Sequence, residues 1–478
     1  MVNKSIDPIL NFNLVCCVGG GFIALFGLVS YLLKEGFYVT EPLVSLCAGV
    51  FLSPYGIRLI RPHEYASSPE ALATVTLCFT RLVLGIQLVI AGIQLPSRYL
   101  KTEWRSLAIL LGPGMLGMWV ITSFLVWQLV PDLGLVQSLI VGACVTPTDP
   151  VLSNSIVKGT FADKHMSRPL QKIIIAESGA NDGLGYLFLF LPLYLVKFAG
   201  QEGGISTAVT SFLSVTCLYT ILLSVVYGAV AGWAAKHLLF WADRRRMVDK
   251  ESLHLFAIAL ALLIIGTVGL IDADDVLACF VAGNTFTWDD WFREQTEHDS
   301  LQPIMDFLLN VAVFMWLGAV CPWEKFFSGD VIPSSRLILL GILVLLLRRL
   351  PVIIALQKQI PQIRNVRHAL IMGFFGPIGI SAIFYLYVTQ DFLLRIQLEH
   401  PEREDCIALA QVTLVTVWFL VISSVVVHGL AIPLGSLALL SPRVFNSIRR
   451  LGTDKDDSAR RINRDNTAAE TQPLLPEP

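Results

Sequence analysis

Charged side chains are scarce in this chain: Asp, Glu, Lys and Arg make up 15% of its 478 residues, whereas hydrophobic residues make up 54%. A soluble domain carries roughly a quarter of its residues as charged ones, because its surface faces water. The mean hydropathy is correspondingly high, at +0.66. This shortage of charge excludes an ordinary soluble domain and predicts that lipid surrounds most of the chain.

Two other features are missing. The first apolar stretch has no basic flank and no small-residue cleavage site, and it is longer than the apolar region of a signal peptide, so we expect it to remain as a helix. The nine cysteines show no metal-ligand spacing and mostly fall in apolar stretches, which predicts free, buried thiols.

What the chain has in abundance is long apolar segments. A helix needs about 20 predominantly apolar residues to cross a bilayer, and about thirteen such segments follow one another. They lie at residues 11–33, 43–60, 72–95, 107–130, 136–157, 169–198, 207–235, 252–271, 276–286, 303–320, 337–356, 369–389 and 407–434. The sequence thus predicts an all-α, multi-pass membrane domain over 1–440. The ninth span is shorter than the length that a helix needs to cross a bilayer.

The loops carry an orientation signal. Lys and Arg are concentrated in loops that follow odd-numbered spans, as in the run Arg244–Arg246, and cytoplasmic loops are the ones enriched in these residues. We therefore expect the amino terminus outside and the carboxyl terminus in the cytoplasm, although Arg58 and Arg61 do not fit this pattern. The charged tail at 441–478 lacks apolar periodicity, which predicts disorder.

Polar residues interrupt the fifth span at Pro147, Thr148, Asp149 and Pro150. A charge at the centre of a spanning helix costs about 2.5–3.5 kcal/mol on insertion scales, so a retained one suggests function. Two prolines so close together cannot both sit in a regular helix. Unwound backbone at membrane depth is tolerated where it is buried in protein or lines a cavity. We expect a discontinuous helix that forms part of an ion site.

The sixth span carries two acids, Glu177 and Asp182, with Asn181 between them. Asp182 is rotated by roughly 140° from Glu177 around a helix, so the two acids face different neighbours. One can meet a structural partner while the other faces the broken fifth helix. Arg348 and Arg349 in the eleventh span are candidate partners for Glu177, unless both reach the membrane surface by snorkelling.

The twelfth span has a second interruption, at Gly376, Pro377 and Gly379. Each interrupted span is the fifth of six consecutive spans, with the seventh as connector. Paired breaks in corresponding helices of two halves are typical of a transporter site at the bilayer midplane, and they predict two inverted six-helix repeats with crossing discontinuous helices. A simple packing kink is the alternative. Asp274 and Asp275 in the short eighth loop are either solvated acids or part of a cation entrance.

Four motifs occur in order in these spans: TPTDP at 146–150, ESGAND at 177–182, RRLP at 348–351 and GFFGPIG at 373–379. Together they resemble the monovalent cation:proton antiporters, and specifically the fungal plasma-membrane sodium/proton antiporters, over approximately 11–441. The resemblance implies a homodimer with crossing broken helices. It also implies that Asp182 binds either ion, that Asp149 and Thr148 shape the site, and that Glu177 pairs with Arg348.

Two positions refine that resemblance. Asn181 stands where electrogenic relatives carry a second aspartate, which implies electroneutral exchange. Phe375 stands where animal relatives carry an arginine, so a role attached to that arginine does not transfer. The expected cargo is Na⁺, with Li⁺ and K⁺ as further candidates, held by Asp182 and Asp149 with neutral oxygens from Thr148 and Asn181. A bound cation or a proton neutralises the carboxylate equally well, which makes the two ions compete.

Other interpretations remain at this stage. Asp149 and Asp182 lie on consecutive spans as the acids of an intramembrane aspartyl protease would, but Asp182 lacks the GxGD context of those enzymes. A cation channel and a transporter of another substrate are further alternatives. We expect no enzyme activity, no cofactor and no nucleic-acid partner.

The tail adds a question about location. Glu470, Leu474 and Leu475 form an acidic dileucine pattern, which resembles signals read by sorting adaptors. An endosomal or vacuolar membrane is therefore an alternative to the plasma membrane.

Overall fold

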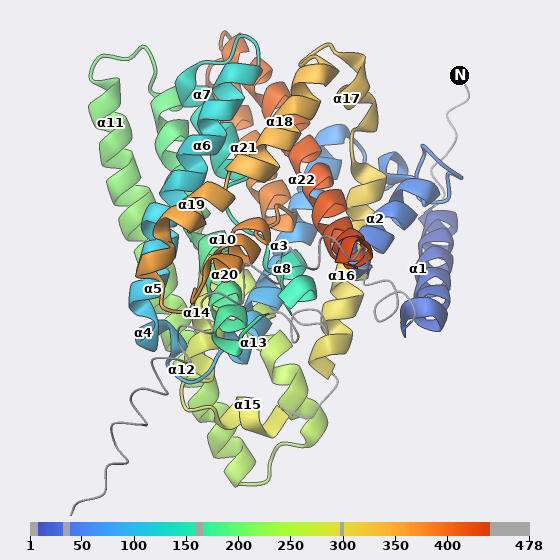
Figure 1. Ribbon diagram of the computed structural model, residues 1–478, viewed down its shortest axis with the longest axis vertical. Coiled ribbons are helices and arrows are strands. Elements are labelled where there is room, and N and C mark those ends of the chain that lie inside the picture. The colour runs from blue at the N-terminus through green and yellow to red at the C-terminus, as the bar shows by residue number, and fades with distance from the viewer. Residues whose placement is uncertain (1–7, 32–38, 158–165, 297–300, 440–478) are drawn as a thin grey trace, which may run out of the picture. The chain divides into compact units, whose positions relative to one another are not determined.

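The computed structural model describes residues 8–31, 39–157, 166–296 and 301–439, and its regular elements in these ranges are helices (Figure 1). No strand occurs within them. The predicted all-α class is therefore confirmed. The described residues up to Gly429 form one compact unit, and those from Leu430 belong to a second. The predicted tail at 441–478, with Glu470, Leu474 and Leu475, lies outside the described residues.

The first six predicted spans each have helices at their place. These are α1 (Pro8–Tyr31), α2 (Glu41–Leu52), α3 (Pro69–Gln94), the continuous run of α5 (Trp104–Ile109), η3 (Leu110–Gly114) and α6 (Met115–Leu129), then α7 (Leu135–Cys144) with α8 (Pro150–Val157), and α10 (Arg168–Lys197). Short helices η2 (Pro62–Glu64) and α4 (Tyr99–Thr102) lie in the connections.

The remaining predicted spans also coincide with helices. They comprise the run of α11 (Gly204–Ser211), η4 (Phe212–Leu222) and α12 (Leu223–Arg244), then α13 (Lys250–Leu270), α14 (Asp275–Phe286), α16 (Leu301–Val320), α18 (Ser334–Leu347) with α19 (Leu350–Leu356) and η5 (Gln357–Gln359), α20 (Val366–Phe374) with α21 (Ile380–Glu399), and α22 (Glu404–Leu439). The short helices α15 (Trp291–Thr296) and α17 (Trp323–Ser328) lie between spans.

Within the described ranges, 9 helices are long and apolar enough to cross a membrane, and α2, α7 and α14 are shorter apolar helices. The exact number of thirteen crossings and the inverted repeat stay predictions. The second span was predicted too long, because α2 ends at Leu52. Pro54 lacks the N–H that would continue the helix, and the chain instead folds back so that the N–H of Ile60 donates to the carbonyl of Leu52 at 2.8 Å.

Helix α10 lies at the centre of the packing, in contact with α3, α7, α8, α14 and α21. Glycine permits its close approach to α14: a Cβ added at Gly183 would lie 2.5 Å from Cβ of Leu277, and one at Gly179 would meet the ring of Phe280. Small residues at membrane helix interfaces allow such approach. The middle of α10, where the candidate residues lie, is therefore enclosed by other helices.

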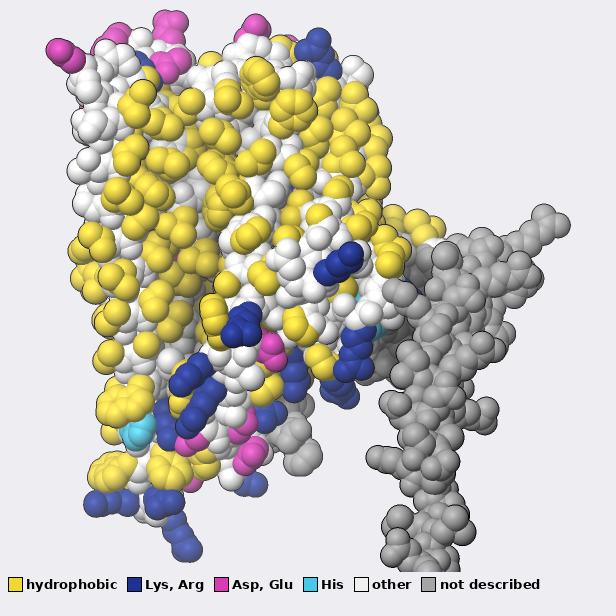
Figure 2. Space-filling view, turned by 60° about the vertical axis from the view of Figure 1, so that its left-hand side comes forward, with side chains coloured by type: hydrophobic (Ala, Val, Ile, Leu, Met, Phe, Trp, Pro, Cys, Tyr) yellow, Lys and Arg dark blue, Asp and Glu magenta, His cyan; other side chains and the backbone are white. Residues whose placement is uncertain are grey.

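Hydrophobic side chains spread over most of the surface that Figure 2 shows, and Lys and Arg side chains gather toward its lower end. Large apolar residues are exposed on several helices; Leu28 is 83% exposed and Leu270 is 86% exposed. An apolar surface of this extent would promote association in water. It suits contact with lipid, as the composition predicts.

Candidate ion-binding site

The fifth predicted span is broken, with α7 ending at Cys144 and α8 beginning at Pro150. Thr146, Thr148 and Asp149 in the intervening segment are each 0% exposed. Asp149 accepts hydrogen bonds from the N–H groups of Val151 at 3.4 Å and Leu152 at 3.3 Å. Its carboxylate therefore lies at the start of α8, where free N–H groups favour a negative charge.

The twelfth span is also broken, between the end of α20 at Phe374 and the start of α21 at Ile380. The two broken segments touch, because the N–H of Asp149 donates to the carbonyl of Pro377 at 3.0 Å. A Cβ added at Gly379 would overlap the Asp149 carboxylate. Only glycine leaves the space that this contact needs. The sequence-predicted breaks are thus brought together in space.

Arg348, the residue that follows α18, contacts both broken segments. Its Nη1 donates to the carbonyls of Thr146 at 3.1 Å and Pro147 at 3.3 Å and also to that of Val145, while its Nη2 donates to that of Gly376. Carbonyls at helix carboxyl ends carry partial negative charge, and a guanidinium offers five donors. Arg348, 2% exposed, therefore compensates the ends of both α7 and α20.

The partner of Glu177 is Arg349, so the assignment of Arg348 to this role is wrong. Arg349 Nη1 donates to Glu177 Oε1 at 2.6 Å and Nη2 to Oε2 at 2.7 Å, while its Nε donates to the carbonyl of Met372 at 3.0 Å. The two arginines lie between the end of α18 at Leu347 and the start of α19 at Leu350. Because the chain bends there, their side chains point in different directions. With 2% and 3% exposure, neither reaches the surface.

A neutral polar cluster connects α10 to the first break. Asn181 Nδ2 donates to Thr148 Oγ1 at 2.8 Å, and the N–H of Thr148 donates to Asn181 Oδ1 at 3.2 Å. Ser178 Oγ lies 3.0 Å from Thr148 Oγ1. Sequence reasoning missed Ser178, although it lies within ESGAND, one turn of helix before Asn181. Neutral oxygens are ligands that a hard monovalent cation accepts, and the role of these residues as ligands stays a prediction.

Asp182 is 0% exposed, and neither of its carboxylate oxygens has a hydrogen-bond partner among the described residues. The charge of Asp149 acts on it most strongly and that of Asp274 less, and the hydroxyl of Ser381 is a neighbouring group that makes no hydrogen bond to it. Ser381 was not predicted; it follows the second break by two residues. A buried charge without a partner costs several kcal/mol. Asp182 is therefore the acid of this site best placed to take up a proton or a cation.

Asp274 and Asp275 are not solvated loop acids, because they are 0% and 3% exposed. Asp275 Oδ2 lies 2.7 Å from Nε of Arg81. Asp274 begins α14, where its Oδ1 accepts from the N–H of Leu277 at 2.9 Å, and its Oδ2 has no partner among the described residues. Their role as a cation entrance stays a prediction.

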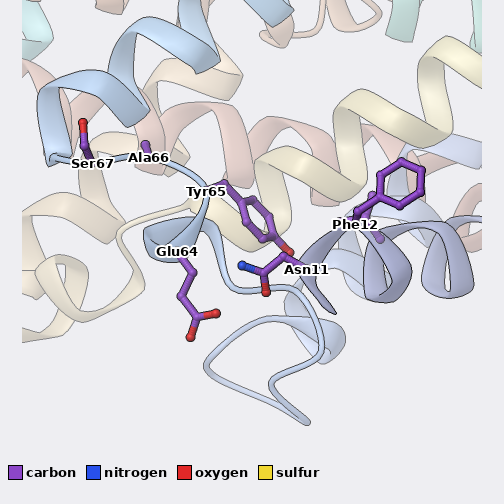
Figure 3. Close-up of a pocket in the computed structure, with 7 residues that line it drawn as sticks. Asn11, Phe12, Glu64, Tyr65, Ala66 and Ser67 are labelled. Carbon is purple, nitrogen blue, oxygen red and sulfur yellow. The ribbon is translucent and has the colours of Figure 1, made fainter. Parts of the chain in front are cut away.

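Elsewhere, a cavity of about 490 Å³ lies between α1 and the segment that follows η2 (Figure 3). Asn11, Tyr65 and Ser67 are among its lining residues, together with Glu64, which pairs with Arg61 at 3.3 Å. None of the predicted site residues borders it. The described ranges also contain no cluster of three or more His, Cys, Asp and Glu that could hold a metal ion.

Fold and site together define an all-helical, multi-pass membrane protein with two discontinuous helices in contact at its centre. Residues 21–434 match the family described as "Sodium/hydrogen exchanger, transmembrane", and the chain belongs to that family. The family resemblance inferred from the four motifs is thereby confirmed.

Curated relatives agree with this family. The chain is 35% identical over 423 residues to "Na(+)/H(+) antiporter 2" of Zygosaccharomyces rouxii, covering 86% of this chain and 51% of the relative. It is 30% identical to "Na(+)/H(+) antiporter" of Schizosaccharomyces pombe, covering 88% of this chain and 89% of the relative. It spans about half the length of the first of these proteins.

Solved structures show the same fold. Two structures of the sodium proton antiporter MjNhaP1 from Methanocaldococcus jannaschii match with TM-scores of 0.60 and 0.64 at 15% and 17% identity. The matches cover 90% and 89% of this chain and 100% and 96% of the other chains.

Proposed function

We propose that this protein exchanges Na⁺ for H⁺ across a membrane and that Asp182 binds the two ions in turn. The observation that carries the proposal is the fully buried Asp182 carboxylate, without a hydrogen-bond partner among the described residues, beside Asp149 and two broken helices in contact. Family membership and relatives named as Na⁺/H⁺ antiporters support the same activity.

Asp182 and the residues around it have different roles in the proposed exchange. A proton or a cation removes its net charge, and an uncharged site is much cheaper to move through a low-dielectric interior than a charged one. Neither ion then crosses alone, because the carboxylate without a bound ion is charged, and moving that charge through the low-dielectric interior is too costly. Thr148 and Asn181 provide neutral oxygens for the cation, while the Glu177–Arg349 pair keeps its charges balanced and takes no part in the exchange.

The same groups bear on the charge balance of the exchange. With Asn181 in place of a second acid, we propose an electroneutral exchange, with Li⁺ and K⁺ as further candidate cargoes beside Na⁺. We propose that Asp274, whose Oδ2 has no hydrogen-bond partner among the described residues, lies on the cation entrance, while its neighbour Asp275 pairs with Arg81.

For its setting, we propose a homodimer in the plasma membrane, with an endosomal or vacuolar membrane as the alternative. The amino terminus is proposed to lie outside and the carboxyl terminus in the cytoplasm, on the grounds of the Lys and Arg distribution in the loops.

The test uses purified full-length protein in sealed vesicles that contain a pH-sensitive dye. A Na⁺ gradient should drive proton movement with the wild type and none with Asp182→Asn, while exposed Asp391→Asn on α21, which is 51% exposed at its side chain, should behave as wild type. Retained exchange in Asp182→Asn refutes the proposal. A channel would instead give current without obligatory counter-movement, and a protease would give no pH change.

A further inference from the structure

Two polar side chains of α22, outside the ion site, hold both ends of the break between α20 and α21. The N–H of Ile378 donates to Ser424 Oγ at 2.8 Å, and His428 Nε2 lies 3.0 Å from the carbonyl oxygen of Phe374. Between them, Ser424 Oγ lies 3.1 Å from His428 Nδ1. Ser424 is 0% exposed and His428 is 2% exposed. The four groups form one continuous chain of hydrogen bonds across the broken segment.

The N–H of Ile378 only donates, so Ser424 Oγ accepts from it. Both ring nitrogens of His428 face a carbonyl oxygen, because Nδ1 also lies 2.8 Å from the carbonyl oxygen of Ser424. A carbonyl only accepts, so the tautomer with its hydrogen on Nε2 donates to Phe374, and its Nδ1 then accepts from Ser424 Oγ. The link to Phe374 requires this tautomer.

The same segment contacts the ion site on its other side. Pro377 accepts from the N–H of Asp149, and Gly376 accepts from Arg348. Buried non-helical backbone has to obtain its hydrogen bonds from partners outside the segment. The position of Pro377 against Asp149 therefore depends on how α22 holds the two ends of the segment.

We propose that Ser424 and His428 form a positioning clamp for the ion site: they hold residues 374–378 in the conformation in which Pro377 meets Asp149. This inference rests on the proposed exchange function and adds two residues of α22 to it. The clamp touches neither ion. It acts through the backbone of the break, so its loss should weaken cation binding more than it slows the maximal rate.

A packing role is the competing explanation, because the His428 ring also lies beside the ring of Phe374, tilted by 39° with centroids 5.1 Å apart. Ser424→Ala tests the hydrogen bonds with little change in volume. The chain offers a matched control one residue earlier: Ser423, half-buried, has its hydroxyl near Gly341 of α18. For the ring, His428→Leu removes both bonds, whereas the amide of His428→Gln can donate to Phe374 and accept from Ser424.

In the vesicle assay, Ser424→Ala and His428→Leu should each raise the half-saturating Na⁺ concentration by roughly three- to tenfold, as expected for the loss of one or two buried hydrogen bonds. Ser423→Ala should match wild type, and Ser424→Thr and His428→Gln should restore most of the affinity. Because the two residues act as a unit, the double variant should be no worse than the poorer single variant. Multiplicative losses, or a Ser424→Ala protein indistinguishable from Ser423→Ala, overturn the clamp.

Hydrogen–deuterium exchange separates this inference from the proposed function. Ser424→Ala should speed amide exchange in the peptide that contains Ile378 without lowering the melting temperature by more than Ser423→Ala does. Absence of ion exchange in wild-type vesicles would overturn the proposed function alone, and the amide exchange would still decide whether Ser424 holds the segment. Unchanged amide exchange at Ile378 would overturn the clamp even where transport falls.

Discussion

Removing the charge of Arg349 should be among the most damaging single changes to the stability of this protein. Arg349→Gln leaves Glu177, with a side chain 1% exposed, without the two bonds of 2.6 and 2.7 Å that balance its charge. Breaking a buried ion pair by removing one partner costs about 3–5 kcal/mol, because the remaining charge is uncompensated. The bond to the carbonyl of Met372 is lost as well.

The partner variant gives the expected rescue. Glu177→Gln in the Arg349→Gln background removes the stranded charge and leaves two amides that can bond to each other. We expect this double variant to recover at least half of the lost free energy of unfolding, so that it is more stable than Arg349→Gln alone by roughly 2 kcal/mol. Glu177→Gln should give no such rescue of Arg348→Gln, since Arg348 bonds to backbone carbonyls.

The assay is equilibrium unfolding of the purified protein in mixed micelles, with melting temperature in detergent as a second measure. Arg349→Gln with wild-type stability would refute the reasoning. So would a rescue of Arg348→Gln, but not of Arg349→Gln, by Glu177→Gln, because that pattern would return the ion pair to Arg348.

Three further outcomes can be checked in the same preparations. Gly379→Ala should lower exchange by roughly tenfold or more, because its methyl group would take the place of the Asp149 carboxylate; normal exchange with normal insertion would contradict the contact. Thr148→Val keeps the shape but removes a hydroxyl, and should raise half-saturating Na⁺ by about tenfold and change the Li⁺-to-Na⁺ ratio; an unaltered ratio in competition assays would exclude Thr148 from the cation shell. Arg81→Gln should lower the free energy of unfolding by about 1–3 kcal/mol. The loss is smaller than for a fully buried ion pair because the Arg81 side chain is 31% exposed. Adding Asp275→Asn should offset the loss, and melting curves that do not respond to Arg81→Gln would rule out a stabilising ion pair.

Sequence reasoning located the two breaks because Pro and Gly cluster with polar residues in one span and with each other in the other. Pro147 and Pro377 lie within the interruptions, and Pro150 begins α8. The length of the apolar segments likewise placed the spans, although the Pro54 turn ended the second one early. These signals depend only on residues close together in the sequence, so a single sequence is enough to detect them.

Contacts between distant segments could not be predicted in this way. Arg348 and Arg349 are adjacent and chemically identical, and only the bend between α18 and α19 decides which one meets Glu177. Asp274 and Asp275 read as loop acids, yet α14 begins there inside the protein. His428 is a single histidine without paired spacing. Its contact with the carbonyl of Phe374, 54 residues away, arises only because α20 ends there.

The link between Asp149 and Pro377 joins main-chain atoms only. Any residue other than proline at position 149 could donate the same bond, and every residue at position 377 could accept it. This hydrogen bond between the two broken segments is therefore insulated from replacement of the side chains at positions 149 and 377 themselves. If Thr148 and Asn181 bind the cation as proposed, their replacement should alter the preferred alkali ion while this main-chain bond is kept.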